Sequence, residues 1–135
     1  IYYVWLQGES DAVIETTAEE YTERIIGYKN KLKEDFGIEK FCLIKVGYFC
    51  AINTWYRDCV ASNEYGKTRD EIIMSAQEKL PTLDSDFIML TDAPTRLSLN
   101  DEYKNFDAIG HFNDKGYEII GREAGEALAK FVKGE

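Results

Sequence analysis

The single histidine of the chain, His111, is the residue best suited to proton transfer near neutral pH. Asp107 lies four residues before it, close enough for a loop to bring its carboxylate back to the imidazole. A carboxylate that orients a histidine base is one half of a Ser-His-Asp arrangement. The spacing equally allows a surface histidine ahead of a helix. Asp92, which closes another apolar run, is a second candidate partner for the imidazole.

A second polar cluster, Gln7, Gly8 and Glu9, follows the apolar run "IYYVWL" at the start of the chain. The Gln7 amide offers N–H donors suited to a developing oxyanion, and Gly8 lets the backbone approach a ligand. Glu9 could orient a neighbouring group. These residue types are also common in ordinary turns, so the preceding strand is what favours a site.

The elements that must position these groups alternate between strands and helices. Hydrophobic patterning predicts strands at residues 1–6, 40–49 and 86–93, and helices at 18–36, 69–80 and 113–132. Alternation of this kind predicts an α/β fold in which right-handed crossovers join parallel strands. In such folds ligands lie beyond the carboxyl ends of the strands, which is where the polar segments fall.

Local signals set the expected boundaries. Thr16 or Thr17 is expected to cap the first helix, and Thr16 with Glu19 has the spacing of a capping box. Gly37 is placed as a helix stop, and Pro81 is expected to end the second helix. Residues 50–68 have no clear period and are predicted to form a long connection, and the stretch from 94 to 110 is expected to be irregular.

Composition narrows the function classes. The 135 residues fit one domain, with no internal boundary, and the net charge of −9 argues against binding to nucleic acid or to an anionic membrane surface. No apolar run is long enough to span a bilayer. With one histidine and no Cys-x-x-Cys spacing, neither a zinc site nor another cofactor is expected, and Cys42 is predicted to be a core residue. No glycine pattern of a nucleotide-binding loop is present, which makes a Rossmann-like binder the least favoured alternative.

Taken together, "VWLQGESDA" and "DAIGHFNDKGYEIIGREAG" resemble two signature blocks of the SGNH (GDSL-like) hydrolase superfamily. The most similar branch is the sialate O-acetylesterase-like group, which includes carbohydrate esterase family six. The matching positions are Trp5, Gln7, Gly8, Glu9 and Asp11 in the first block, and Asp107, His111, Gly116, Tyr117 and Gly121 in the second.

The resemblance implies a three-layer α/β/α, flavodoxin-like fold and hydrolysis of an acyl ester, often an acetyl group on a sugar, without a metal. It implies that His111 is the general base on a serine, that Asp107 orients it, and that Gln7 and Gly8 help to form the oxyanion hole. Glu9 is expected to support that loop. The expected partner is an acetylated carbohydrate or another small ester.

Two features depart from the family pattern. The usual Asp-x-x-His spacing would place the acid at Ala108, so either the loop is one residue longer or Asp107 is not the acid. The Gly-Asp-Ser or Gly-Gln-Ser block of the nucleophile does not occur, and Ser10 does not lie at a nucleophile turn.

We therefore expect residues 1–135 to be the C-terminal part of one esterase domain, with only its C-terminal strands present and without activity on its own. The outer strands of so small a sheet would need cover from other residues or from a second copy, and a homo-oligomer through the exposed edge is possible. The alternative function is a non-catalytic carbohydrate-binding or interaction module on the same scaffold. The sequence does not indicate a cellular compartment.

Overall fold

Strands and helices alternate in the computed structural model, which describes residues 1–49 and 68–135. The described elements, in chain order, are β1 (Tyr2–Trp5), α1 (Glu9–Val13), α2 (Ala18–Phe36), β2 (Lys40–Ile44), α3 (Arg69–Leu83), β3 (Phe87–Thr91), α4 (Ala93–Leu97), the 3₁₀ helix η2 (Asp101–Tyr103) and α5 (Asp114–Lys133). The predicted alternation is therefore present, and α1, α4 and η2 add to it. The predicted long connection lies, except for Thr68, outside the described residues.

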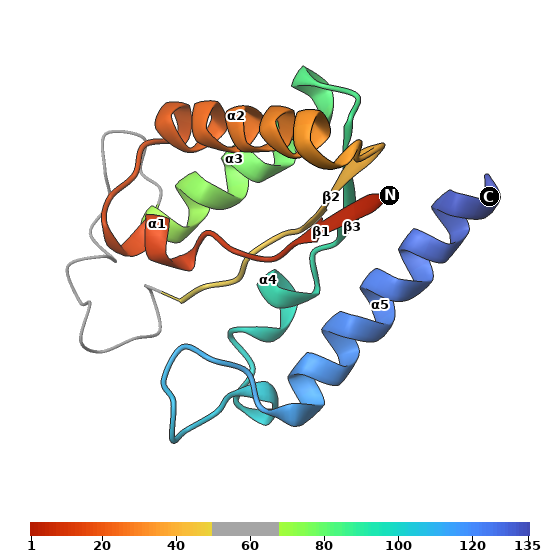
Figure 1. The fold of residues 1–135 in the computed structure, drawn as a ribbon. Helices are drawn as coiled ribbons and strands as arrows, with labels where there is room; N and C mark the ends of the chain where they lie inside the picture. Colours follow the sequence, from red (N-terminus) through yellow and green to blue (C-terminus); the bar gives the residue numbers. More distant parts are fainter. Residues whose placement is uncertain (50–67) are drawn as a thin grey trace.

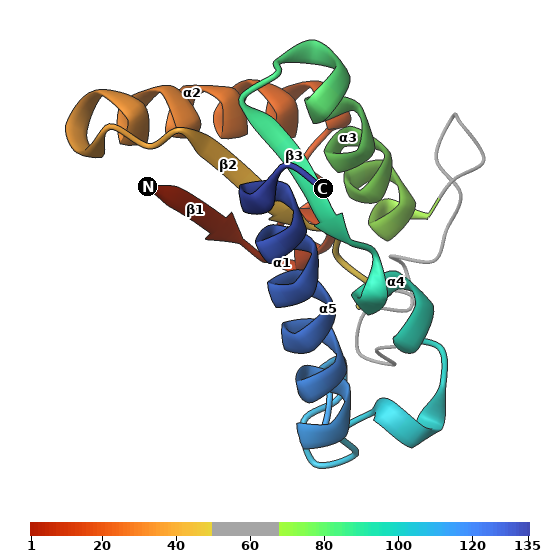
Figure 2. The ribbon, with the colours of Figure 1, turned by 90° about the vertical axis from the view of Figure 1, so that its right-hand side faces the viewer.

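The three strands form one parallel sheet with β2 in the centre. In the register of the sheet, Phe41 lies between Tyr3 on one side and Phe87 on the other. Figures 1 and 2 show α2 and α3 over one face of the sheet and α5 over the other. The three-layer α/β/α fold with a parallel sheet is thus confirmed, and the carboxyl ends of all three strands point to the same edge.

The two faces of β2 belong to two hydrophobic clusters. Phe41 and Leu43 are fully buried against α2 and α3. Ile44 packs on the opposite side with Ile120 and Ala124 of α5. Successive side chains of a strand point to opposite faces, so an almost uninterrupted apolar strand is what two helical layers require. Cys42, also on β2, is buried, as predicted. Its thiol is free, and burial raises the pKa of that thiol to about 11.

The capping box of α2 lies one residue later than predicted. The Thr17 hydroxyl accepts a hydrogen bond from the Glu20 N–H, and the Glu20 carboxylate accepts one from the Thr17 N–H. The expected pair of Thr16 and Glu19 is wrong because the Thr16 hydroxyl is buried and donates to Asp11 instead. The helix ends at Gly37, as predicted.

Two further boundaries differ from prediction. Helix α3 continues through Pro81 to Leu83, because a proline in the last turn removes only its own N–H, and the Asp84 N–H still donates to the Leu80 carbonyl. Strand β2 ends at Ile44. The Lys45 N–H still donates to the Thr91 carbonyl of β3, and from Val46 onward the backbone bonds to side chains of other elements in place of a strand.

Strand β1 is an edge strand in the described part of the chain, where it pairs only with β2. Val4 of β1 is 45% exposed, and Leu6, just after the strand, is 38% exposed. The small parallel sheet expected from the sequence is thus present, with β1 and β3 as its outer strands among the described residues.

A buried lysine ties α2 to the loop before β3. The Lys29 ammonium is only 4% exposed and lies 2.7 Å from an Asp84 oxygen and 3.4 Å from an Asp86 oxygen. Hydrogen bonding to Lys29 lowers the pKa of Asp84. The pKa of Asp86 is also lowered, chiefly by Lys33.

We predict that Asp84→Asn reduces the dependence of stability on pH. A carboxyl group with a lowered pKa in the folded state is ionised in both states above about pH 4, so its stabilisation is complete at neutral pH and is lost below about pH 4. Urea unfolding at about pH 7 and about pH 3 should therefore show a smaller difference in the variant than in the wild type. Glu34→Gln, which removes an exposed carboxylate on α2, should leave that difference unchanged. An equal difference in Asp84→Asn and wild type would contradict the assignment.

Candidate functional site

The carboxyl edge of the sheet and the loop before α5 meet around one small hollow. Its lining comes from four segments that are distant in sequence, and consists of Glu9, Gly47, Tyr48, Phe49, Ser98, Gly110 and Phe112. Each of the two blocks that the sequence singled out therefore contributes to this hollow, the first through Glu9 and the second through Gly110. Gln7 and Gly8 precede Glu9 directly, and His111 follows Gly110.

Gly8 connects β1 to α1 at a position where no other residue fits. Its φ of 153° is one that L-amino acids rarely adopt. A Cβ atom there would lie 2.8 Å from the Ile73 side chain and 3.2 Å from that of Val46. The glycine lets the backbone pack closely against α3, and this contact fixes the position of the turn relative to the sheet.

The Gln7 side chain is held by the acidic residue of its own motif. Its amide nitrogen donates to Asp11 at 2.8 Å. Asp11 in turn accepts from the Thr16 hydroxyl at 3.0 Å and lies 3.8 Å from Arg24. Because an amide nitrogen carries two hydrogens, this bond fixes the orientation of the Gln7 amide and leaves a second N–H.

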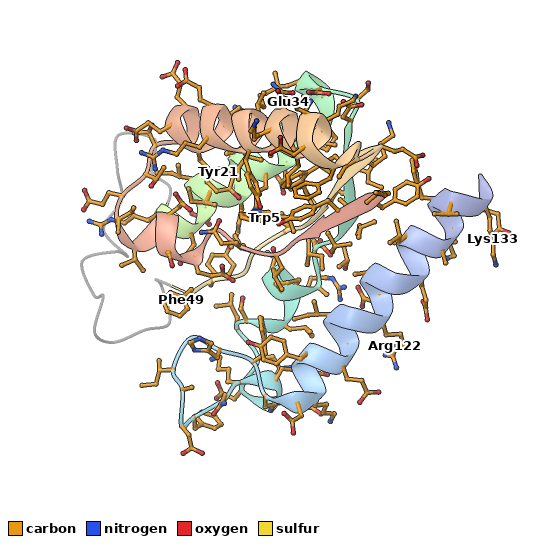
Figure 3. All side chains as sticks on the ribbon, in the orientation of Figure 1. Trp5, Tyr21, Glu34, Phe49, Arg122 and Lys133 are labelled. Atoms are coloured by element: carbon orange, nitrogen blue, oxygen red, sulfur yellow. The ribbon has the colours of Figure 1, made fainter. Side chains whose placement is uncertain are left out.

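The Gln7 main-chain carbonyl points into the protein. It accepts hydrogen bonds from the Tyr21 hydroxyl at 3.1 Å and from the Gln77 amide at 2.9 Å. Figure 3 shows Tyr21 and Trp5 between α2 and the sheet. Sequence reasoning missed Gln77, although one signal was available: a glutamine in register with Ile73 and Leu80 on the apolar face of α3 must find buried partners.

Helix α4 holds the segment that follows β2. The Thr95 hydroxyl donates to the Val46 carbonyl at 2.8 Å, and the Ser98 hydroxyl accepts from the Tyr48 N–H at 3.0 Å. Thr95 and Ser98 thus replace the strand partners that this backbone lacks. The wall of the hollow from Gly47 to Phe49 is fixed by these bonds.

The loop that carries His111 closes on itself. The Asn105 N–H donates to the His111 carbonyl at 2.9 Å, and the Asn105 side-chain oxygen accepts from the N–H groups of Asp107 and Ala108. The Asn113 side chain caps α5 at Gly116 and donates to two carbonyls of the preceding segment. This scaffold presents His111 as an exposed side chain at the start of α5.

Phe49 links this loop to the rest of the hollow. Its ring lies 5.9 Å from the His111 ring, centre to centre, and perpendicular to it. Gly110 has a φ of 90°, and a Cβ atom there would lie 2.2 Å from the Phe49 ring. Figure 3 shows Phe49 between the α1 end of the molecule and the loop before α5. The contact therefore sets the distance between His111 and the segment after β2.

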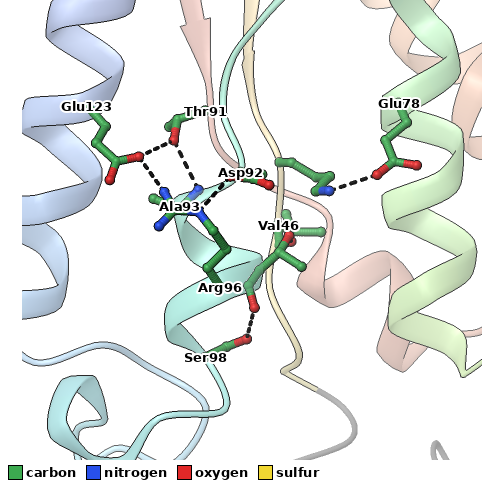
Figure 4. A network of polar contacts seen from close by, with 10 residues as sticks. Val46, Glu78, Thr91, Asp92, Ala93, Arg96, Ser98 and Glu123 are labelled. Atoms are coloured by element: carbon green, nitrogen blue, oxygen red, sulfur yellow. Dashed lines mark hydrogen bonds and ion pairs between the residues drawn. The ribbon is translucent and has the colours of Figure 1, made fainter.

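The two candidate acids differ in their surroundings. Asp92 pairs with Arg96 at 2.8 Å, and this bond lowers the pKa of its carboxyl group. Arg96 also reaches Glu123 of α5, which accepts from the Thr91 hydroxyl at 2.7 Å (Figure 4). Asp92 thus belongs to a network that joins β3 to α4 and α5. Asp107 lies in the loop of His111 with an exposed side chain, and within the described residues no hydrogen bond or ion pair joins its carboxylate to the imidazole.

Residues 1–49 and 68–135 contain neither a cluster of metal ligands nor a helix suited to cross a membrane. No group of three or more His, Cys, Asp or Glu side chains in these ranges is arranged to hold a metal ion. No helix in the same ranges has both the length and the apolarity of a transmembrane segment.

Comparison with known proteins bears on the chemistry of this hollow. A family model described as "Carbohydrate esterase, sialic acid-specific acetylesterase" matches residues 3–130, which include both sequence blocks and every residue that lines the hollow. Searches of curated proteins and of solved structures give no significant match. The family model spans nearly the whole chain, and the chain accordingly belongs to the carbohydrate esterase family of sialic acid-specific acetylesterases.

Proposed function

We propose that the chain supplies the oxyanion loop and the acid–base groups of a carbohydrate O-acetylesterase that works by a Ser-His-Asp mechanism. The observation that carries the proposal is the shared hollow. Glu9 of the first block and Gly110 of the second both line it. In the proposed mechanism Gln7, Gly8 and His111, which adjoin these residues in the chain, act on a single acetyl group. Family membership supports an acetylated carbohydrate as the substrate.

In this mechanism His111 accepts the proton of a serine hydroxyl while the serine oxygen bonds to the acetyl carbon. The Gly8 N–H and the Gln7 amide donate to the oxyanion of the tetrahedral intermediate. The intermediate collapses as the C–O bond to the sugar breaks, and the protonated His111 returns its proton to the sugar oxygen. Water, activated by the same imidazole, then releases acetate from the serine. Asp107 orients the imidazole, and Glu9 supports the loop.

The nucleophile belongs, in this proposal, to a Gly-Asp-Ser or Gly-Gln-Ser block, and neither triplet occurs among the 135 residues. Residues 1–135 are then the C-terminal part of a single esterase domain. The chain by itself should not hydrolyse p-nitrophenyl acetate, and a form of the protein that also contains the block should. Hydrolysis by the chain alone that disappears in Ser10→Ala would instead identify Ser10 as the nucleophile.

We predict that His111→Ala, in the form that contains the nucleophile, lowers kcat for p-nitrophenyl acetate by about 10²- to 10⁴-fold, the range of general base catalysis. The measurement is initial rates over a range of substrate concentrations. Lys115→Gln, which removes an exposed charge from the first turn of α5, is the matched control and should retain wild-type kcat. Full activity in His111→Ala would remove the imidazole from the mechanism.

A second prediction separates the two candidate acids. Asp107→Asn should lower kcat by about 10²-fold or more, because the imidazole loses the carboxylate that stabilises its charged form. Asp92→Asn should lower thermal stability, since Arg96 loses a partner, with little change in kcat. The opposite pattern, loss of turnover in Asp92→Asn alone, would assign the orienting role to Asp92.

A third prediction concerns the contact between Phe49 and Gly110. Gly110→Ala should lower kcat by about tenfold or more, because a Cβ in this strained conformation must push the loop and His111 away from Phe49. Gly125→Ala in α5 has open space around it and should raise stability by about 0.5–1 kcal/mol without changing kcat. Unchanged kinetics in Gly110→Ala would show that the position of the loop does not matter for turnover.

A non-catalytic carbohydrate-binding module remains the second candidate function. The observation in its favour is that, within the described residues, no hydrogen bond or ion pair joins the Asp107 carboxylate to the His111 ring. The test uses the form of the protein that contains the nucleophile block. If that form binds an acetylated sugar without hydrolysing it, the result favours this module over the esterase.

A further inference from the structure

The side-chain amide of Gln77 is a buried hydrogen-bond centre that neither sequence block contains. Gln77 is fully buried in α3. Its oxygen accepts from the Val46 N–H at 2.9 Å, and its nitrogen donates to the Gln7 carbonyl at 2.9 Å and to the Tyr21 hydroxyl at 2.8 Å. Both N–H groups of the amide are therefore used, and the carboxyl ends of β1 and β2 are tied to the same side chain.

The bond to the Gln7 carbonyl determines the direction of the next N–H. The peptide between Gln7 and Gly8 is trans, so its C=O and N–H point to opposite sides of the chain. Because the carbonyl points inward to Gln77 and Tyr21, the Gly8 N–H points away from α3. No acceptor in the described residues takes a hydrogen bond from this N–H.

We propose that Gln77 is a positioning residue for ester hydrolysis, which holds the Gln7 carbonyl so that the Gly8 N–H is presented to the acetyl oxygen. This inference rests on the proposed function, since it gives the Gly8 N–H a role in the oxyanion hole. Gln77 acts through Gly8 and touches neither the substrate nor the reacting atoms.

The surroundings of Gln77 make this orientation hard to change. A Cβ atom at Gly8 would lie 3.3 Å from the Gln77 side-chain nitrogen, so the backbone of the turn packs closely against the Gln77 amide. The Tyr21 hydroxyl, whose pKa burial raises to about 12, stays protonated and donates to the same carbonyl at 3.1 Å. Rotation of the peptide would leave two buried donors without an acceptor, which is strongly unfavourable.

The choice of an amide at this position is also informative. The side chain must accept from Val46 and donate to Gln7, and among buried neutral side chains of this length only glutamine or a protonated glutamate does both. An ionised glutamate would place a carboxylate oxygen against the Gln7 carbonyl. This difference provides a variant whose function can be restored by protonation alone.

The test uses the form of the protein that contains the nucleophile block, with p-nitrophenyl acetate as the substrate. In Gln77→Glu, kcat at about pH 8 should fall by about 10²-fold with KM little changed, as for the loss of an oxyanion donor. At about pH 5, where a buried glutamate is protonated, the ratio of variant to wild-type kcat should recover to within about threefold.

Tyr21→Phe is the matched control. It removes the other donor to the Gln7 carbonyl and leaves the bond from Gln77 in place. It should lower stability in urea by an amount similar to Gln77→Glu and retain most of the wild-type kcat. If kcat in both variants falls in proportion to the loss of stability, Gln77 is a structural residue only and the inference is wrong.

A second measurement does not depend on activity. Residual dipolar couplings in isotope-labelled protein report the direction of the Gly8 N–H relative to the amides of α2. This coupling should change in Gln77→Leu and persist in Tyr21→Phe. An unchanged coupling in Gln77→Leu overturns the inference even if esterase activity is found. An inactive wild type with a changed coupling overturns the proposed function and the oxyanion role, while the geometric effect of Gln77 stands.

Discussion

Burial of the central strand β2 on both faces is the constraint on which the other elements depend. Phe41 and Leu43 are covered by α2 and α3, and Ile44 is covered by α5, so no face of this strand meets water. Each fully buried side chain of this size contributes about 1.5–3 kcal/mol. Helices must therefore lie on both sides of the sheet, and the crossovers that place them there make the strands parallel. Because the strands are parallel, their carboxyl ends lie at one edge of the sheet. Gln7, Tyr48 and Asp92, which follow the three strands, therefore lie at that edge as well.

Polar groups at that edge are satisfied mainly by side chains. The Lys45 N–H still donates to the Thr91 carbonyl of β3, but from Val46 onward the backbone has no neighbouring strand among the described residues. Gln77, Thr95 and Ser98 supply the missing hydrogen bonds. A buried backbone group without a partner costs about 1–3 kcal/mol, so these three side chains are needed for the fold as well as for the shape of the hollow.

The sequence predicted the elements with strong hydrophobic periods and missed those set by tertiary contacts. The bounds of α2 were predicted correctly because its apolar face and Gly37 are local signals. Whether Thr16 or Thr17 caps it depends on Asp11, which captures the Thr16 hydroxyl, and no local pattern contains that contact. Pro81 was predicted to end α3, yet the helix continues for another two residues because the last turn tolerates the missing N–H. Helix α4 has only five residues, too few for the sequence to show a helical period of hydrophobic positions.

In the candidate site, too, the sequence predicted what local motifs determine and missed what tertiary contacts determine. The residue types of the two blocks identified the family, which the family model confirms, and the parallel topology placed their segments around one hollow. Gln77 and Phe49 could not be assigned from the blocks, because each acts through packing against a residue distant in sequence. The partner of His111 was left open between two acids. The pairing of Asp92 with Arg96 is a local contact four residues along the chain, and it could be recognised only with knowledge of the short helix α4.

The self-closure of the loop from Asn105 to Asn113 has a consequence for how such chains can diverge. Its hydrogen bonds join residues at the two ends of the loop, and Asn113 caps α5 independently of the residues in between. An insertion or deletion within the loop is therefore absorbed locally, and the helix that follows keeps its position. In the proposed mechanism Asp107 is the acid, and it then lies one residue further from His111 than in the spacing common in the superfamily, a change that this arrangement tolerates. Drift in the length of this segment can accumulate in evolution while the scaffold around it stays the same.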